Sequence, residues 1–423
     1  MESRDRFRWR TYENFIVVIM FFTYGLVMMD RLSITYLFPF IAPTLKLNEA
    51  QIGMSVSILS ICWAISSWLF SSWSDLINAK KRFLVIAILI FSLASFSTGL
   101  ATTFGLLLFA RGLMGAAEGP VVTIAQTSVV AESTPHRMGF NIGFVQSSTA
   151  LLGTVVAPLL VVAIAQHAGW HNAFYILTIP GLIVAFILMK FMREPKLIHQ
   201  SETEAHVRPN PGDYKVVFKH RNVWLCMVIS IGFMSWLFAF TTFAPTFLTS
   251  IDKFSPSQAS LIMSAMGLGS FVWGLIGPYL SDRIGRKPVI ISFGLAATIP
   301  PILIALLHVN VGTFMILALL SALAQGYAPI FLSVIPGESV PRAFVATAMS
   351  LIILVGELCG GTIVPTVAGA LADAVSPTAP LWMAAAGSFL VFLVSFGLKE
   401  TAPVILKRRG IAVEMETVRV IHQ

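Results

Sequence analysis

The chain contains 423 residues, of which 56% are hydrophobic and 11% are charged, and its mean hydropathy is +0.82. A soluble domain carries about 25% charged residues, so this composition excludes a soluble globular protein. The formal net charge of +8 does not indicate nucleic-acid binding, because the basic residues fall in alternate connections between apolar segments.

Long apolar segments recur from Phe15 to Leu398, and each can cross a bilayer core about 30 Å thick. We count twelve of them. The first segment, Phe15 to Phe38, is too long for the apolar core of a signal peptide and carries charges at its centre, so we expect it to be retained as a helix. The sequence therefore predicts an all-α membrane protein with twelve transmembrane helices.

A polar stretch at 193–221 divides these segments, and its low apolar content predicts a linker. Because basic residues gather at both chain ends and in this stretch, the positive-inside rule places both termini in the cytoplasm. The predicted parts are a cytoplasmic N-terminus (1–14), an N-terminal six-helix bundle (15–192), a cytoplasmic linker (193–221), a C-terminal six-helix bundle (222–398) and a cytoplasmic tail (399–423).

Two inner turns are repeated along the chain. The turn starting at Ser74 recurs at Ser281, an offset of 207 residues, and the turn at Glu132 recurs at Glu338, an offset of 206. Two unrelated turns at nearly one offset indicate a duplicated six-helix unit, as in secondary transporters whose site lies between two pseudo-symmetric halves. The turn residues that we expect to gate the conformational change, by tying helices together, are Asp75, Asp282, Arg283 and Arg286.

Four ionisable residues lie at the centres of apolar segments: Asp30 and Arg31 in the first, Arg111 and Glu118 in the fourth. Each such charge costs roughly 2.5–3.5 kcal/mol at the centre of a membrane helix, so these residues are expected to be paired or functional. Arg111 and Glu118 share a helix face but lie about 10 Å apart along the axis. We hypothesise that Asp30 meets Arg111 between helices, while Arg31 and Glu118 face a central cavity.

The second copy of the first turn resembles the signature loop G-x-x-x-D-R-x-G-R-[RK] of the major facilitator superfamily. The leading glycine is displaced to Gly277. The matching positions are Asp282, Arg283, Gly285, Arg286 and Lys287. The resemblance covers about residues 15–398, and it implies a twelve-helix fold and transport by alternating access.

The Asp-Arg pair of the first helix, with R-G-x-x-G-x-x-E from Arg111 to Glu118, resembles the anion:cation symporter family. The similarity is to its D-galactonate transporter branch, which holds bacterial sugar-acid/proton symporters. It implies that Arg31 binds the substrate carboxylate, that Asp30 and Glu118 are proton-coupling acids, and that Arg111 couples the two functions.

The sequence departs from that branch at several positions. Trp63 stands where sugar-acid members carry a tyrosine, and the aromatic residues of the seventh segment either pack helices or contribute to the site. We expect Trp63, Gln146 and Tyr327 to bind substrate beside Arg31. Glu357, near the middle of the eleventh segment, is either a third proton-coupling acid or a protonated group that hydrogen-bonds a neighbouring helix. These departures favour a carboxylate with fewer hydroxyls than a sugar acid.

We predict a monomeric symporter that imports an organic carboxylate with protons. Drawing an anion inward against a potential that is negative inside requires more than one proton, and two acids can supply them. An anion exchanger for phosphate or phosphorylated compounds is the alternative, but arginines would be expected in both halves and the second half has none at mid-helix. The lack of an N-x-[ST] sequon and the short outer connections favour a bacterial inner membrane.

No enzyme or cofactor is indicated by the sequence. Cys62, Cys226 and Cys359 lie in apolar segments without paired spacing, and no H-E-x-x-H motif occurs, so no metal site is predicted. The expected partners are a small organic anion, protons as the driving ion, and the lipid bilayer.

Overall fold

The computed structural model describes residues 12–76, 79–134, 137–194, 217–307, 309–341 and 344–408. Within these ranges all regular structure is helical. Most of the predicted N-terminus, linker and tail (1–11, 195–216 and 409–423) lies outside the described residues.

The first half of the chain folds into six helical rods. The fifth rod is continuous but contains η1, a π-helical segment in which each hydrogen bond spans one residue more than in an α-helix. The elements are α1 (Tyr12–Leu45), α2 (Glu49–Leu76), α3 (Lys80–Gly99), α4 (Phe104–Glu132), α5 (Met138–Ser148) with η1 (Thr149–Val156) and α6 (Ala157–Ala168), and α7 (Trp170–Phe191).

The second half repeats this arrangement, and π-helical segments interrupt its fourth and fifth rods. A short helix, α18 (Pro403–Arg408), follows the last rod. The elements are α9 (Arg221–Ser250), α10 (Pro256–Ile284), α11 (Arg286–Leu306), α12 (Val311–Ser321) with α13 (Leu323–Pro329), η3 (Ile330–Val334) and α14 (Ile335–Ser339), α15 (Val345–Gly356) with η5 (Glu357–Ile363) and α16 (Val364–Ala374), and α17 (Ala379–Ser395).

Local sequence explains where several rods begin. Ser255 and Gln258 form a reciprocal capping box at the start of α10, so that two backbone N–H groups are satisfied by side chains. Gly285 separates α10 from α11 with a φ of 109°, a conformation that a Cβ atom disfavours. The repeated turn therefore sits at a helix break that only glycine adopts readily.

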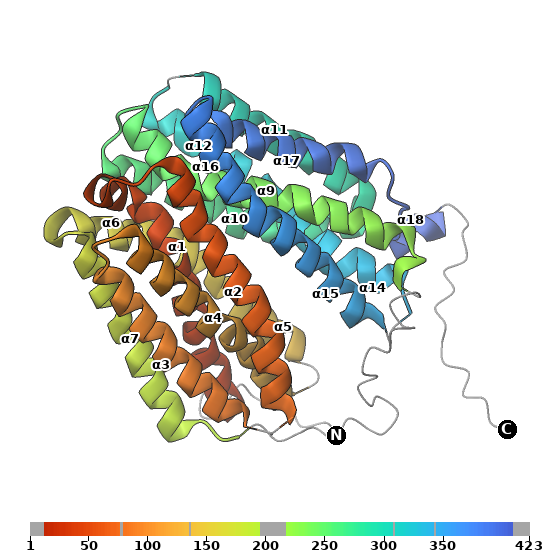
Figure 1. Cartoon of the computed structure of the whole chain (residues 1–423). Helices are drawn as coiled ribbons and strands as arrows, with labels where there is room; N and C mark the ends of the chain where they lie inside the picture. The colour runs from red at the N-terminus through yellow and green to blue at the C-terminus, as the bar shows by residue number, and fades with distance from the viewer. Residues whose placement is uncertain are drawn as a thin grey trace.

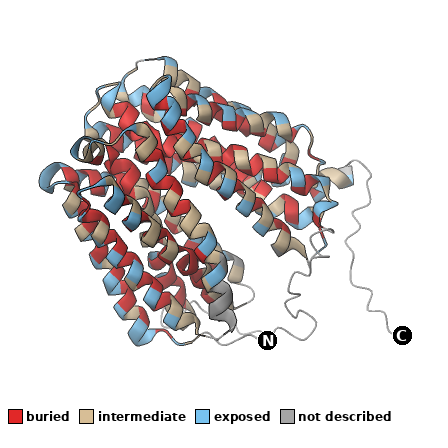
Figure 2. Ribbon diagram, in the orientation of Figure 1, coloured by how far each residue is buried: buried red, intermediate tan, exposed pale blue. Residues whose placement is uncertain are grey.

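Eleven of the described rods are long and apolar enough to cross a membrane, and α17 is apolar over 17 residues, close to the lower limit of about 17 for a spanning helix. Large apolar side chains such as Leu93, Phe109 and Ile183 are more than half exposed on the outer faces. Figure 2 shows these exposed faces around a buried interior in each half. The predicted all-α fold with twelve transmembrane helices is confirmed for this part of the chain.

The duplication appears in the contacts that close each half. The Glu194 carboxylate, just after α7, accepts from the backbone N–H of Lys81 at 3.1 Å, and Glu400, just after α17, accepts from that of Arg286 at 2.8 Å. In both halves an acid that follows the sixth rod therefore caps the third. The π-helical segments η1 and η5 also correspond, since their first residues are 208 positions apart, near the offset of the repeated turns.

The two halves meet at one end of the molecule and diverge toward the other end, where α1 begins and α18 lies (Figure 1). We call these the distal end and the terminal end. At the distal end the Ser57 hydroxyl donates to the carbonyl of Thr362 at 2.5 Å, and Ser264 donates to that of Val155 at 3.0 Å. These bonds join α2 to η5 and α10 to η1, so the two π-helical segments lie at the seam between the halves.

Asp373 in α16 fastens the distal end further. Its carboxylate accepts from the backbone N–H groups of Glu49 and Ala50 at 3.0 and 2.9 Å, so a residue of the second half caps a helix of the first. Glycines tighten the same seam, because a Cβ atom on Gly53 or Gly369 would meet backbone of the opposite half.

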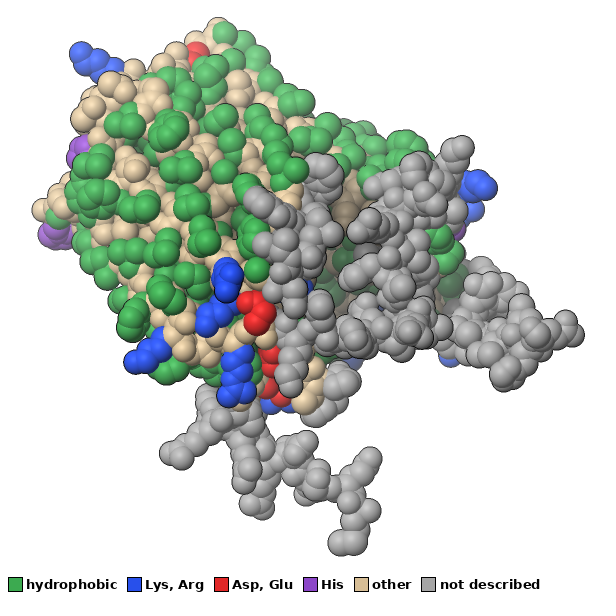
Figure 3. All heavy atoms as spheres, turned by 60° about the horizontal axis from the view of Figure 1, so that its bottom comes forward, with side chains coloured by type: hydrophobic (Ala, Val, Ile, Leu, Met, Phe, Trp, Pro, Cys, Tyr) green, Lys and Arg blue, Asp and Glu red, His purple; other side chains and the backbone are tan. Residues whose placement is uncertain are grey.

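Charged side chains gather at the terminal end. Figure 3, in which this end comes forward, shows Lys, Arg, Asp and Glu side chains there beside apolar flanks. The basic run Lys80–Arg82 and the pair formed by Glu13 and Arg137, at 3.6 Å, belong to this end of the first half. Such a charge distribution matches a membrane protein whose ends lie in water.

Gly277→Ala should destabilise the fold, because the added methyl group would meet the backbone of Gly326 in α13, which cannot move aside. Overpacking of this kind costs about 1–3 kcal/mol. The midpoint of thermal unfolding in detergent measures the loss. Gly274→Ala, on the same helix with nothing within 4 Å of a Cβ atom, is the matched control and should leave the midpoint unchanged. Equal shifts would contradict the close approach of α10 and α13.

Asp373→Ala should shift the protein toward a state with an open distal end, because the cap across the seam is lost. A side-chain cap contributes about 1 kcal/mol, which corresponds to roughly a fivefold change in the equilibrium. The labelling rate of a single cysteine placed at the distal end reports the shift. Asn310→Ala removes a cap at 2.9 Å within the second half alone and should leave the rate unchanged.

Candidate functional site

Arg111 is buried at the contact of α4 with α1, where it is 1% exposed. Its Nη2 donates to the backbone carbonyl of Arg31 at 3.2 Å, and its Nη1 lies 3.0 Å from the sulfur of Met114. Its Nε has no hydrogen-bond partner. Arg111 thus ties α4 to the backbone of α1 directly beside the predicted substrate-binding residue.

Asp30 lies close to this arginine without forming an ion pair with it. The Asp30 carboxyl is 2% exposed, both of its oxygens lack a hydrogen-bond partner, and Arg111 and the Ser95 hydroxyl are the polar groups near it. The hypothesised direct pairing of Asp30 with Arg111 is therefore wrong for this conformation, because the arginine directs its donors to a carbonyl and a sulfur instead. Their interaction is electrostatic, across a gap.

Glu118 is also enclosed and unpaired. It is fully buried, and neither carboxyl oxygen has a hydrogen-bond partner. The charges near it are, in order of effect, Arg31, Arg111 and Asp30. The four residues that the sequence singled out are therefore brought together, although the expected contacts between them are not all formed.

Glycines of α4 set the position of this cluster relative to α2. A Cβ atom at Gly115 would meet the backbone of Leu59, and one at Gly119 would meet Ser66 and the carbonyl of Trp63. The helices are therefore in close contact on the side of α4 that faces α2. This contact brings Trp63 beside Arg31, whose guanidinium carbon lies 5.3 Å from the centre of the indole ring.

Arg31 is the partly exposed member of the cluster and its electrostatic centre. Besides Glu118, its charge acts on Tyr24 in the same helix and on Glu357 in the second half. A cation in contact with an aromatic face, with further donors free, is suited to binding a carboxylate. Arg31 and Trp63 are therefore adjacent, and their contact with substrate stays a prediction.

The sequence analysis missed Tyr24, on which the charge of Arg31 acts, and two residues that lie beside Tyr24. The Tyr24 hydroxyl lies near the side chains of Gln126 in α4 and Thr149 at the start of η1. Tyr24 precedes Arg31 by seven residues, which places both on one helix face, and that spacing could have identified it. Thr149 gave no such signal, because the π-helical segment changes the helical register.

Glu357 opens η5 and is 8% exposed. Its Oε2 atom lacks a hydrogen-bond partner and lies 2.6 Å from the position that a Cβ atom on Gly361 would take, a position that the ring of Phe238 in α9 also approaches. One of the two predicted roles for Glu357 was a hydrogen bond to a neighbouring helix, and Oε2 forms no such bond. The role of a proton-coupling acid remains a prediction.

The other two predicted substrate contacts lie in different surroundings. Tyr327 is fully buried, and its ring packs against Phe233 and Phe331 at centroid distances of 6.0 and 6.1 Å. Its hydroxyl has no hydrogen-bond partner. Gln146 is exposed on α5. In this conformation neither residue is joined to the Arg31 cluster by a described contact, so their substrate role stays a prediction.

The predicted gating residues of the second half form a network at the terminal end. Arg286 binds Asp282, the Ser281 hydroxyl at 2.7 Å and Glu338 at 2.9 Å, all within that half. Arg283 is exposed and lies over the Tyr279 ring at 4.4 Å. The side chain of Asp75 lies outside the described residues. The contacts of Arg286 stay within the second half, as expected if the terminal end is open. The gating role of these residues remains a prediction.

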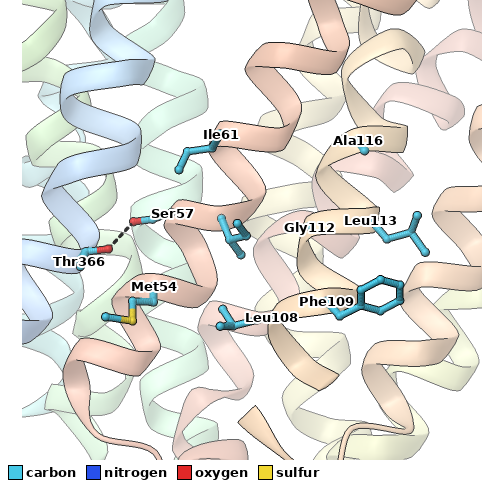
Figure 4. Close-up of a pocket in the computed structure, with 10 residues that line it drawn as sticks. Met54, Ser57, Ile61, Leu108, Phe109, Gly112, Leu113, Ala116 and Thr366 are labelled. Atoms are coloured by element: carbon cyan, nitrogen blue, oxygen red, sulfur yellow. Dashed lines mark hydrogen bonds between the residues drawn. The ribbon is translucent and has the colours of Figure 1, made fainter. Parts of the chain in front are cut away.

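A separate groove of about 710 Å³ runs between α2 and α4 (Figure 4). Its lining is apolar and includes Phe109, which is 66% exposed on the outer face, so the groove faces the bilayer. The hydroxyls of Ser57 and Thr366 meet at one side of it, 2.9 Å apart. It holds none of the charged residues and is not the candidate transport site.

Known transporter sequences resemble this chain. The chain is 30% identical over 289 residues to a probable 4-methylmuconolactone transporter of Cupriavidus pinatubonensis, and 29% identical over 276 residues to a hexuronate transporter of Bacillus subtilis. The alignments cover 66% and 64% of this chain, and 66% and 65% of those relatives, slightly less than two thirds of each. A cis,cis-muconate transport protein of Acinetobacter baylyi is 25% identical over 81% of this chain and 84% of its own.

Solved structures share the fold. A bacterial homologue of the human lysosomal transporter Spinster, inward-facing and unoccupied, superposes with a TM-score of 0.76 over 92% of this chain and 98% of its own, at 18% identity. A D-xylose-proton symporter gives 0.74 over 93% and 99%, at 17% identity. The family model of the Major Facilitator Superfamily matches residues 20–254 and 250–413. The protein therefore belongs to the Major Facilitator Superfamily.

Proposed function

We propose that this protein is a symporter that imports a small organic carboxylate together with protons by alternating access. In this proposal Arg31 binds the substrate carboxylate beside Trp63, and Asp30 and Glu118 carry the protons. Arg111 links the two, since it contacts the backbone of Arg31 and lies near both acids.

The observation that carries the proposal is the pair of buried acids without hydrogen-bond partners beside two arginines. A buried carboxyl group favours its neutral form, and a nearby cation favours its charged form. A substrate carboxylate that neutralises Arg31 would therefore make protonation of Glu118 easier. Substrate and proton binding would then favour one another, as symport requires.

The arrangement of the halves supports alternating access. In this conformation the contacts across the seam lie at the distal end, while the network of Arg286 at the terminal end stays within one half. Rocking of the halves about the central cluster would exchange the closed end for the open one. If the basic terminal end is cytoplasmic, as the positive-inside rule favours, this is the inward-facing state.

The relatives support the class of substrate. Three of them are named for the transport of hexuronate, sulfoacetate and cis,cis-muconate, which are organic acids. We propose accordingly that the protein acts as a monomer in a bacterial inner membrane, with both termini cytoplasmic. No cofactor is invoked, because the proton gradient supplies the driving force.

In proteoliposomes with an alkaline interior, labelled carboxylate should accumulate. Glu118→Gln should keep exchange of labelled for unlabelled substrate but lose net accumulation by about tenfold or more, since a neutral amide cannot carry the proton. Glu132→Gln, at the end of the same helix, should retain both activities. Wild-type accumulation that needs an internal anion and ignores the pH gradient would support the exchanger and contradict symport.

Asp30 and Arg111 should couple energetically without an ion pair. Arg111→Met should lower the thermal midpoint, because it leaves the buried Asp30 without its nearby cation, and adding Asp30→Asn should restore part of the loss. Coupled neighbours differ from additivity by about 0.5–3 kcal/mol. Arg111→Met combined with Glu132→Gln should be additive. Additivity for Asp30 and Arg111 as well would rule out their interaction.

A further inference from the structure

Glu357 is placed where the second half meets the substrate-binding cation of the first. It begins η5, which packs against both α2 of the first half and α9 of its own half. Arg31 is the charged group that acts on it. The two residues form no ion pair, so a gap of more than 4.0 Å separates their charged atoms.

The second half offers no cation to this gap. Between residues 222 and 398 the basic residues all occur at helix ends or in the connections. They are Lys253, Arg283, Arg286, Lys287 and Arg342. Glu357 is therefore the ionisable residue that the second half contributes at mid-membrane, and its neighbours there include the apolar ring of Phe238.

We propose that Glu357 determines specificity, so that the site takes organic monoanions and rejects dianions, in contrast to the relatives named for sulfoacetate and cis,cis-muconate, which are dianions at neutral pH. This inference rests on the proposed function. The ligand would place its one carboxylate on Arg31 and an uncharged hydrogen-bonding group, such as a hydroxyl, ester or lactone oxygen, toward Glu357.

The charge balance of the site explains this selectivity. A protonated Glu357 donates a hydrogen bond to a neutral oxygen, and an ionised Glu357 accepts one from a hydroxyl group. A second carboxylate is repelled by the ionised acid, and the second half has no cation that could offset this repulsion.

Binding to the purified full chain at neutral pH tests the proposal with two matched pairs of compounds, gluconate with glucarate and monomethyl adipate with adipate. The wild-type protein should bind the monoanion of a pair at least about tenfold more tightly than the dianion, an effect of the size expected for like charges at a partly buried site. Glu357→Gln should reduce this ratio to about threefold or less. Leu358→Ala, whose side chain is exposed on the same segment, should preserve the wild-type ratio.

The outcomes separate this inference from the proposed function. If no carboxylate binds, or if Arg31→Ala binds them as well as wild type, the proposed function fails and this inference with it. If carboxylates bind but the wild-type ratio is near one, or Glu357→Gln leaves it unchanged, only the selectivity is overturned. Should Glu357→Gln fail to fold, the wild-type ratio decides, and Glu357→Asp should retain the preference for monoanions.

Discussion

The structure depends on holding two acids and two arginines inside a membrane protein with few direct bonds between them. Such a cluster is stable because attraction over several ångströms is strong where water is excluded, even without ion-pair geometry. A tight ion pair would be more stable but would respond less to a ligand. Glu118 has no hydrogen-bond partner and Arg31 is the first charge acting on it, so in the proposed mechanism its charge state would depend on what binds Arg31.

Close packing of the first half makes this arrangement possible. Glycines at positions 115 and 119 bring α4 against α2, and that contact places Trp63 against Arg31. The acids that cap the third rod of each half, Glu194 and Glu400, close the two bundles in the same way. In the proposed transport cycle each half would therefore move as a unit, with the seam carrying the contacts that change.

Much of the fold could be predicted because its determinants are local. Segment length and hydropathy predicted the spans, and the repeated turns predicted the duplication, whereas the orientation inferred from the basic connections stays a prediction. The charged cluster was also predictable, because residues such as Arg111 are too costly in a membrane to be incidental. The partners of Arg111 were not predictable, because a backbone carbonyl and a methionine sulfur carry no signal in the sequence. Asp373 capping α2 was missed for a similar reason, since the cap joins residues more than 300 positions apart.

The π-helical segments η1 and η5 occupy equivalent places in the two halves, both at the seam. A π-helical turn holds one residue more than an α-helical turn, and helical residues are about 100° apart around the axis. Converting such a turn to α-helix would therefore turn the following part of the rod about its own axis by a large angle. Such a change at the seam would rotate α16 or α6 about its own axis. Each helix could then present a different face to the opposite half without tilting or bending its rod.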